Sequence, residues 1–215
     1  MWLDIFNFGK KYIDVIFYAG YQDNLVLCFT GRVQQCLSYR NSGDVNFITE
    51  MTVLNAAEFF RYGYLNKTFT KGTTFEEILS SALSDSNVKV GYITPEINIS
   101  LPKDKTFIGQ TMDLLGREYG GYNIFVNNNE LNILGDNDVI PGEIITITDS
   151  SGLLGSPKRA NVYTEIEMIF EPQLIAGQAV EVLSESMPQF NRAYKVIKVQ
   201  HSGIISPRVC GKLIT

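Results

Sequence analysis

Apolar and polar residues alternate with a period of two along the first quarter of the chain. Residues 12–18 and 25–33 are two such runs, separated by the turn-forming residues 22–24 (QDN), and a third run at 45–53 follows the turn at 41–44 (NSGD). This period is typical of strands with one apolar face, so we predict three antiparallel strands in a meander. The residues on that face are Ile13, Val15, Phe17, Leu25, Leu27, Phe29, Val33, Val45, Phe47, Thr49, Met51 and Val53.

Helical spacing appears twice in the middle of the chain. Thr74 is followed three residues later by Glu77, the pattern of a capping box, and apolar residues at 78, 79, 82 and 83 continue as a stripe. A second helix is predicted to begin near Thr106, because apolar residues recur at 108, 112, 115 and 119. Gly120-Gly121 supplies residues that adopt the left-handed conformation at its end.

The remainder of the chain is predicted to consist of strands. Residues 122–126 and 130–134 flank three asparagines, which favour a tight hairpin turn. The Gly- and Ser-rich segment 149–159 indicates a boundary, and residues 161–170 then alternate with Val162, Thr164, Ile166, Met168 and Phe170 inward. Further strands are expected at 179–183, 193–200 and 208–214.

The order of these elements predicts the fold class. Strands come first, a helix and a helix-plus-hairpin insert follow, and strands return at the end. This order favours a mainly β protein with an α+β insertion over a parallel βαβ sheet.

Composition narrows the class of protein. Hydrophobic residues make up 45% of the 215, which is enough for a core, and 18 basic against 23 acidic residues give a net charge of −5. There is no basic stripe of the kind that reads nucleic acid, so sequence-specific DNA binding is disfavoured. No apolar stretch is long enough to span a bilayer, and the opening residues lack the features of a secretory signal, so we expect a soluble, unexported product.

Candidate chemistry is sparse. His201 is the only histidine, and nothing beside it resembles a nucleophile elbow, so we interpret it as a strand-end residue with an ordinary hydrogen bond. Cys28, Cys36 and Cys210 are not spaced as zinc ligands and are expected to be buried or half-buried free thiols.

Three further patterns have a simpler structural explanation than a binding or catalytic site. Residues 152–155 (GLLG) lack the capped helix and lysine of a phosphate loop, and residues 136–138 (DND) lack the glycine and final glutamate of a calcium loop. Glu165 and Glu167 share a strand face, as glycosidase carboxylates do, but any solvated strand shows that pattern. We therefore predict no catalytic, cofactor-binding or metal-binding residue, no cofactor and no enzyme activity.

A succession of short motifs resembles a known family. The opening motifs are at 12–15 (YIDV), 19–21 (AGY), 29–33 (FTGRV), 38–40 (SYR) and 43–44 (GD). The later motifs are at 71–74 (KGTT), 78–79 (IL), 171–174 (EPQL), 176–178 (AGQ), 194–196 (YKV) and 199–203 (VQHSG). In this order they resemble the baseplate hub or tail-hub proteins of phages, which include the phage late control D proteins.

The resemblance implies a fold and an assembly. It implies two tube-like β-barrel domains, at residues 1–64 and 151–215, separated by a small helix-plus-hairpin domain at 65–150. The first barrel is shorter than is usual in the family, so a neighbouring chain or a separate partner is expected to complete it. His201 then belongs to a structural turn.

The implied function is that of a structural subunit of the baseplate hub. Three copies form a ring that joins the tail tube to the tip or spike and lets DNA pass in transit. The implied partners are the tail tube protein, the spike or tip protein and the tape-measure protein, in a virion assembled in the host cytoplasm.

Two alternatives stay open. A β-sandwich carbohydrate-binding module of a tail or surface protein is compatible with the 11 tyrosines, and glycan binding by the isolated monomer would favour it. A tail-associated hydrolase is disfavoured by the single histidine, and turnover of peptidoglycan would revive it.

Overall fold

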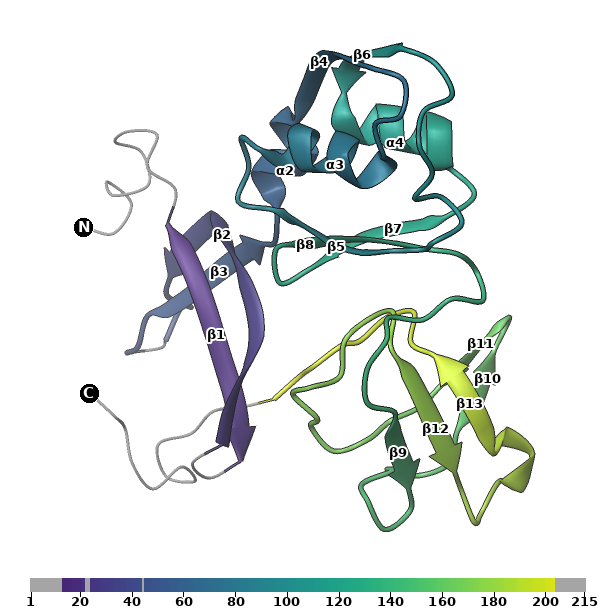
Figure 1. The fold of residues 1–215 in the computed structure, drawn as a ribbon. Coiled ribbons are helices and arrows are strands. Elements are labelled where there is room, and N and C mark those ends of the chain that lie inside the picture. Colours follow the sequence, from purple (N-terminus) through teal and green to yellow (C-terminus); the bar gives the residue numbers. More distant parts are fainter. Residues whose placement is uncertain (1–12, 22–23, 44, 204–215) are drawn as a thin grey trace. The chain divides into compact units, whose positions relative to one another are not determined.

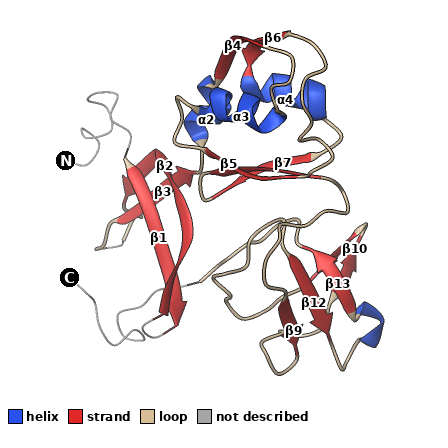
Figure 2. Ribbon diagram, in the orientation of Figure 1, coloured by secondary structure: helices blue, strands red, loops and turns tan. Residues whose placement is uncertain are grey.

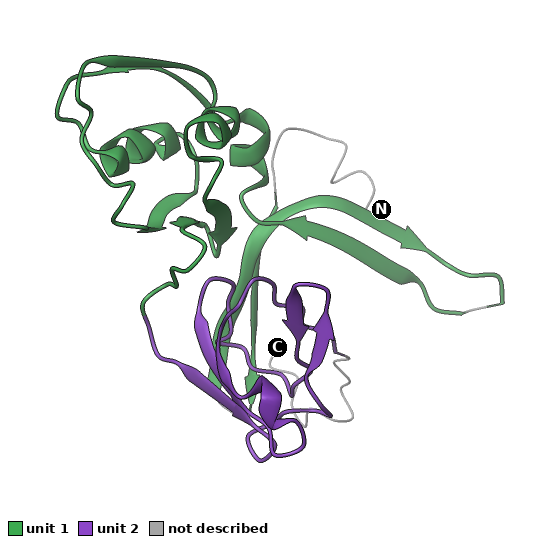
Figure 3. Ribbon diagram, turned by 90° about the vertical axis from the view of Figure 1, so that its right-hand side faces the viewer, with its two compact units in different colours: residues 1–141 green, residues 142–215 purple. Residues whose placement is uncertain are grey.

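The structure is a computed structural model and describes residues 13–21, 24–43 and 45–203 (Figure 1). The chain separates into two compact units, residues 1–141 and 142–215 (Figure 3). The described residues are rich in strands and contain three α-helices, which confirms the mainly β class (Figure 2). The division into domains 1–64, 65–150 and 151–215 stays a prediction.

Unit 1 begins with the predicted meander. Strands β1 (Asp14–Tyr21), β2 (Asn24–Tyr39) and β3 (Ile48–Leu54) form an antiparallel sheet in the order β1-β2-β3. The turn before β3 contains Gly43, whose positive φ of 95° suits glycine. Residues 22, 23 and 44 of the predicted turns lie outside the described residues. The alternating pattern therefore predicted both the strands and their pairing.

The rest of unit 1 places helices between two sheets (Figure 1). One layer is β4 (Tyr64–Phe69) paired with β6 (Lys105–Gln110), and the other is β5 (Lys89–Ile93), β8 (Glu130–Leu134) and β7 (Asn123–Asn127) in that order. The helices are α2 (Ala57–Tyr62), α3 (Phe75–Leu83) and α4 (Thr111–Tyr119).

Two apolar cores lie on opposite sides of these helices. The core against β8 contains Phe59, Phe75, Leu79, Leu83, Val88, Ile97, Leu115, Leu131 and Ile133. The core against β4 and β6 contains Leu65, Phe69, Ile78, Phe107 and Leu114. Helix α3 contributes to both cores, which is why it is buried on two sides.

Helix α3 begins as the sequence predicts. Thr74 Oγ1 accepts a hydrogen bond from the backbone N–H of Glu77 at 3.3 Å, and Glu77 Oε2 accepts one from the N–H of Thr74 at 2.8 Å. This reciprocal pair satisfies two N–H groups that the first helical turn leaves without partners. The predicted capping box is therefore confirmed.

The start of the second helix was predicted wrongly. Residues 105–110 form β6, and α4 begins at Thr111, five residues later than expected. The apolar residue Ile108 matches helical spacing by coincidence and lies 59% exposed on β6. Ile108 pairs with Asn66 of β4, which is distant in sequence, and this pairing overrides the local pattern. Gly120 also ends α4 with a right-handed φ of −64°, not in the left-handed conformation.

The hairpin of β7 and β8 agrees with the sequence. Asn128 and Asn129 both have positive φ, 45° and 66°, as a two-residue turn of this kind requires. Strand β8 also pairs in parallel with β5, so it is the central strand of its sheet. Its residues Leu131, Ile133 and Leu134 have no exposed surface.

Unit 2 is built on a three-stranded sheet in the order β13-β12-β9. Strand β12 (Ala179–Leu183) is central, antiparallel to β13 (Arg192–Lys195) and parallel to β9 (Ile145–Thr148). A short hairpin of β10 (Lys158–Ala160) and β11 (Tyr163–Glu165) lies apart from this sheet in the pairing scheme. The sheets of the described residues are open, so the two-barrel arrangement stays a prediction.

The predicted long strand at 161–170 is broken. Its burial alternates as expected from Thr164 to Phe170, but only residues 163–165 form a strand. Val162, predicted to be inward, is 81% exposed, because Asn161 has a positive φ of 55° and turns the chain between β10 and β11. The strand expected at 193–200 ends at Lys195, and the one expected at 208–214 lies outside the described residues.

A buried polar contact connects the ends of β5 and β8. The Thr94 hydroxyl donates to Asp138 Oδ2 at 2.8 Å and accepts from the N–H of Gly135 at 2.9 Å. Thr94 is 1% exposed, so these bonds have no competition from water. They fix the segment that leaves β8 against the end of β5.

Replacing Thr94 by valine is expected to lower the free energy of unfolding of unit 1 by about 1–3 kcal/mol, because the buried bonds that the Thr94 hydroxyl makes with Asp138 and with the Gly135 N–H are lost. Chemical denaturation measures the change. The control is Thr68→Val, which removes an exposed hydroxyl pair with Thr106 and should change stability by no more than about 0.5 kcal/mol. Equal effects of the two variants would contradict the role of this contact.

Candidate assembly surface

Among the described residues, the side chains considered for chemistry are not brought together. The His201 ring lies edge-on to that of Phe170, with centroids 4.9 Å apart, and no hydrogen bond of its side chain accompanies this contact in the described residues. Cys28 and Cys36 are half-buried free thiols, as predicted, whereas Cys210 lies outside the described residues. No group of three metal-ligating side chains occurs in the described part of the chain.

The other candidates have structural roles. Asp138 accepts the bond from Thr94, and Asp136 accepts one from Asn123 Nδ2 at 3.3 Å, so the 136–138 segment is a polar turn. Glu165 and Glu167 are both exposed. The 152–155 segment is a turn whose backbone pairs with residues 167 and 169.

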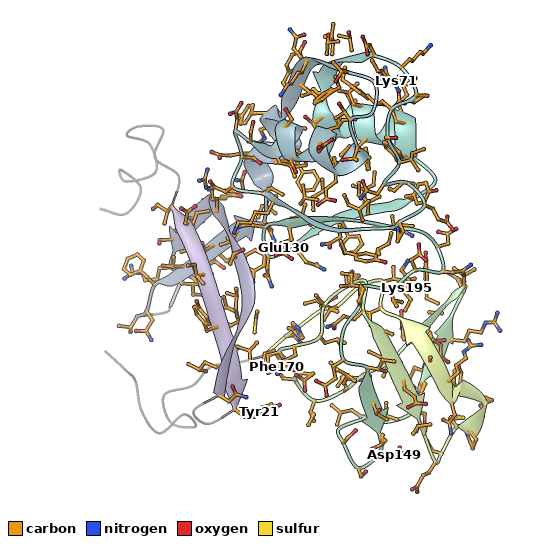
Figure 4. The ribbon with its side chains drawn as sticks, in the orientation of Figure 1. Tyr21, Lys71, Glu130, Asp149, Phe170 and Lys195 are labelled. Atoms are coloured by element: carbon orange, nitrogen blue, oxygen red, sulfur yellow. The ribbon has the colours of Figure 1, made fainter. Side chains whose placement is uncertain are left out.

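The meander β1–β3 has an unusual distribution of side chains. Apolar residues project from both faces of this sheet, which we call the ribbon, and Tyr21 lies at its end (Figure 4). Val33 is its only large apolar residue that is fully buried among those described. The exposed apolar residues of the ribbon and its connecting turn are Ile16, Phe17, Tyr18, Tyr21, Leu25, Leu37, Tyr39, Val45, Phe47, Ile48, Met51 and Leu54.

The tip between β2 and β3 is the most exposed apolar part of the ribbon. Val45 is 89% exposed and Phe47 is 72% exposed, and Arg40 lies 5.7 Å from the Phe47 ring centre. In Figure 3 this hairpin projects away from the helices of unit 1. Contiguous apolar surface of this extent is typical of a protein-interaction site.

An ionic contact joins the ribbon to the helices. Arg32, in the middle of β2, donates from Nε to Asp14 Oδ1 at 2.7 Å, and its Nη1 contacts Glu58 Oε2 in α2. The hydrogen bond with Asp14, followed by the charge of Glu58, raises the pKa of Arg32 above its ordinary value against the opposing effect of desolvation. A guanidinium is charged in proteins at any ordinary pH, and through these two contacts it connects β1, β2 and α2.

A cleft of about 240 Å³ lies beside this contact, between the ribbon and the helical part of unit 1. Arg32, Asp14 and Glu58 contribute its charged side chains. It contains no cysteine, histidine or paired nucleophile and base. The residues that line it are Asp14, Val15, Ile16, Thr30, Gly31, Arg32, Ala56, Ala57, Glu58, Phe59, Ser86, Asn87, Val88 and Asn129. We interpret the cleft as the joint between the ribbon and the helices.

The arrangement as a whole is suited to protein contact. Sequence reasoning predicted a single apolar face for these strands and missed the second. The missed signal is the unbroken apolar run from Val15 to Ala19, because a strand that is covered on both faces reads as a continuous apolar run. Among the described residues, no helix is long and apolar enough to cross a membrane.

Comparison with known proteins agrees with this description. No curated protein matches the chain at a significant level. A family model described as baseplate hub gp41 matches residues 4–204, which is nearly the whole chain. This match confirms the resemblance to phage baseplate hub proteins. The chain, with its open apolar ribbon, therefore belongs to the baseplate hub gp41 family and is a structural protein of the phage tail baseplate.

Proposed function

We propose that the chain is a subunit of the hub that joins the tail tube to the tip or spike, and that three copies form a ring through which DNA passes. The observation that carries this proposal is the ribbon, whose apolar residues are exposed on both faces in a single chain. A two-stranded or three-stranded ribbon without a core beneath it gains stability when neighbouring chains cover it. A ring of subunits supplies such neighbours.

The same proposal gives the two strand-rich parts of the chain their role. They become tube-like barrels when neighbouring chains complete them, and the helical layer lies to the outside. The net charge of −5 suits a channel for DNA, because a lumen without excess positive charge does not retain phosphate groups. The tail tube, spike or tip, and tape-measure proteins are the partners, and assembly takes place in the host cytoplasm.

The proposal includes the absence of catalysis. The single histidine contacts a phenylalanine ring, and the two carboxylates considered for acid–base work, Glu165 and Glu167, are exposed. The family is one of structural proteins. The chain accordingly acts through its geometry, with no site residue and no cofactor.

We expect three copies of the chain in each isolated tail tip. Native mass spectrometry of the chain with its tail-tube and spike proteins counts the copies, and a cryo-EM map of the tail tip locates them. The chain purified alone serves as the control and is expected to be monomeric or poorly behaved. A well-folded monomer that never enters three-copy complexes with any tail protein would contradict the proposal.

A further inference from the structure

The ribbon is joined to the helical part of unit 1 at one chain crossing. Strand β3 ends at Leu54 and α2 begins at Ala57, so the backbone passes from one part to the other through Asn55 and Ala56 (Figure 1). The residues that form the two cores of the helical part come from position 56 onward. Among the described residues, the ribbon therefore adds no side chain to these cores, and the crossing sets its orientation.

The backbone at the crossing is strained. Ala56 has φ 52° and ψ 24°, the left-handed conformation, whereas a residue that precedes a helix usually has an extended one. The left-handed conformation is unfavourable for a residue with a Cβ atom. The carbonyl oxygen of Ala56 accepts a hydrogen bond from the N–H of Phe60 at 3.1 Å, so the helix fixes the peptide group that follows Ala56. The dihedral angles of Ala56 then determine the direction in which the ribbon leaves α2.

An unpaired polar atom lies next to this strain. Oδ1 of Asn55 is buried and accepts no hydrogen bond from the described residues. A buried acceptor without a partner is unfavourable, and this one is unfavourable only in the orientation that buries it. Two consecutive residues therefore favour a different angle between the ribbon and α2.

An ion pair opposes this tendency. Arg32 stands where β1 and β3 are staggered along β2, since it pairs with Asp14, the first residue of β1, and with Leu54, the last residue of β3. Its guanidinium contacts Asp14 within the ribbon and Glu58 in the first turn of α2. The contact with Glu58 spans the joint, so turning the ribbon about Ala56 breaks it.

We infer that the ribbon is a hinged arm with an ionic latch. Ala56 is the hinge, and the pair of Arg32 and Glu58 holds the ribbon at its angle to α2. When the pair opens, Ala56 relaxes to a negative φ, Asn55 gains access to water, and the ribbon turns to a second angle, which we call the open angle. The inference goes beyond the proposed function, because it applies to a single chain whatever the number of copies in a ring.

The opposing contributions are similar in size, which makes the angle adjustable. The left-handed conformation lowers the population of a residue with a Cβ atom by about tenfold, and a charge-assisted hydrogen bond raises the population of the state that contains it by a similar factor. A ligand shifts such an equilibrium when it binds one state better than the other. A neighbouring protein that places a charge beside Glu58 therefore releases the arm on contact.

Distances between two spin labels, measured by pulsed electron paramagnetic resonance, report the angle. The joint pair carries its labels at Glu50→Cys in β3 and at Glu96→Cys beyond β5, both at exposed positions. The ribbon pair, Leu25→Cys with Glu50→Cys, detects bending of the ribbon itself. The labels are attached to the full-length chain with its three cysteines replaced by serine, at a concentration that keeps it monomeric. Melting temperatures establish that each variant is folded.

Glu58→Gln removes the charge of the latch and keeps its length. The population at the open angle, seen as a second distance in the joint pair, should rise about tenfold, while the ribbon pair stays unchanged. The matched control is Asp113→Asn, which makes the same change in the first turn of α4 and should keep the distances of the parent chain. An unchanged distance in Glu58→Gln, or an equal change in the control, would overturn the inference.

Salt tests the latch without a substitution in it. Raised ionic strength screens the half-exposed pair, so it should increase the second distance in the parent chain and add nothing in Glu58→Gln. An equal effect of salt on both chains would mean that other charges set the angle, and would contradict the latch.

Substitutions at the hinge have effects of opposite sign. Glycine adopts the left-handed conformation without cost, so Ala56→Gly added to Glu58→Gln should reduce the second distance about tenfold. Valine resists that conformation more strongly, so Ala56→Val should produce the second distance with the latch intact. A rise with glycine, or a change confined to the ribbon pair, would overturn the hinge. The copy number of the tail tip does not enter these distances, so they test the hinge separately from the hub function.

Discussion

Replacing Ile133 by alanine is expected to lower the free energy of unfolding of unit 1 by about 2–5 kcal/mol. Ile133 has no exposed surface and lies in β8, between β5 and β7. Its side chain belongs to the core that the helices form on this sheet. Truncation removes buried apolar contacts and leaves a cavity that a strand held on both edges cannot close.

The measurement is chemical denaturation, with hydrogen exchange of the β8 amides resolved by mass spectrometry. Ile108→Ala is the matched control, since the same side chain on β6 is 59% exposed, and its loss should change stability by about 0.5 kcal/mol or less. A similar loss in both variants would show that burial in this core does not determine the stability of unit 1.

The strands of the ribbon could be predicted because the sequence signals that specify them lie within or next to each strand. Alternating residues specify strands, and short polar turns specify which strands pair. The exposure of their apolar side chains, as seen among the described residues, could not be predicted in the same way. Whether an apolar face is covered depends on what else is near it, and a single chain does not contain all of its neighbours.

The error at α4 has a different physical cause. Residues 105–110 combine a strand with an apolar spacing that also fits a helix, and the register with β4 decides between them. The parallel pairs β5–β8 and β9–β12 were likewise not predicted, because their partners lie about 35 to 41 residues apart in sequence. Contacts at such separations leave no local periodic signal.

The sequence predicted that this is a hub protein, but it did not predict which residues form the exposed apolar surface. The succession of motifs predicted a hub protein, and the family match confirms it. Those motifs include AGY at 19–21 and FTGRV at 29–33, which lie on the ribbon itself. The stagger between β1 and β3 became visible only with the pairing register, because β2 reads from sequence as one short strand ending at Val33 instead of a strand that continues to Tyr39.

Gly152→Ala is expected to destabilise unit 2 by about 2–6 kcal/mol, combining backbone strain with overpacking. Gly152 has a positive φ of 116°, and a Cβ atom there would lie 2.3 Å from Cγ1 of Ile169. The approach cannot relax easily, because the N–H of Ile169 donates to the carbonyl oxygen of Gly152 at 2.8 Å. The neighbouring Leu153 is part of the core of unit 2, so a shift of this turn also disturbs that core.

Gly155→Ala separates the two contributions to this loss. Gly155 has a positive φ of 66°, but nothing lies within 4 Å of the position that its Cβ would take. Its substitution should therefore cost only the backbone strain, about 1–2 kcal/mol. Hydrogen exchange of the β12 amides measures both variants, since β12 is the central strand of the sheet in unit 2. Equal losses would mean that the Ile169 side chain can move away from the added Cβ atom without an energetic cost. A larger loss at Gly152 would show that the GLLG segment contains glycine there because the chain packs closely against Ile169.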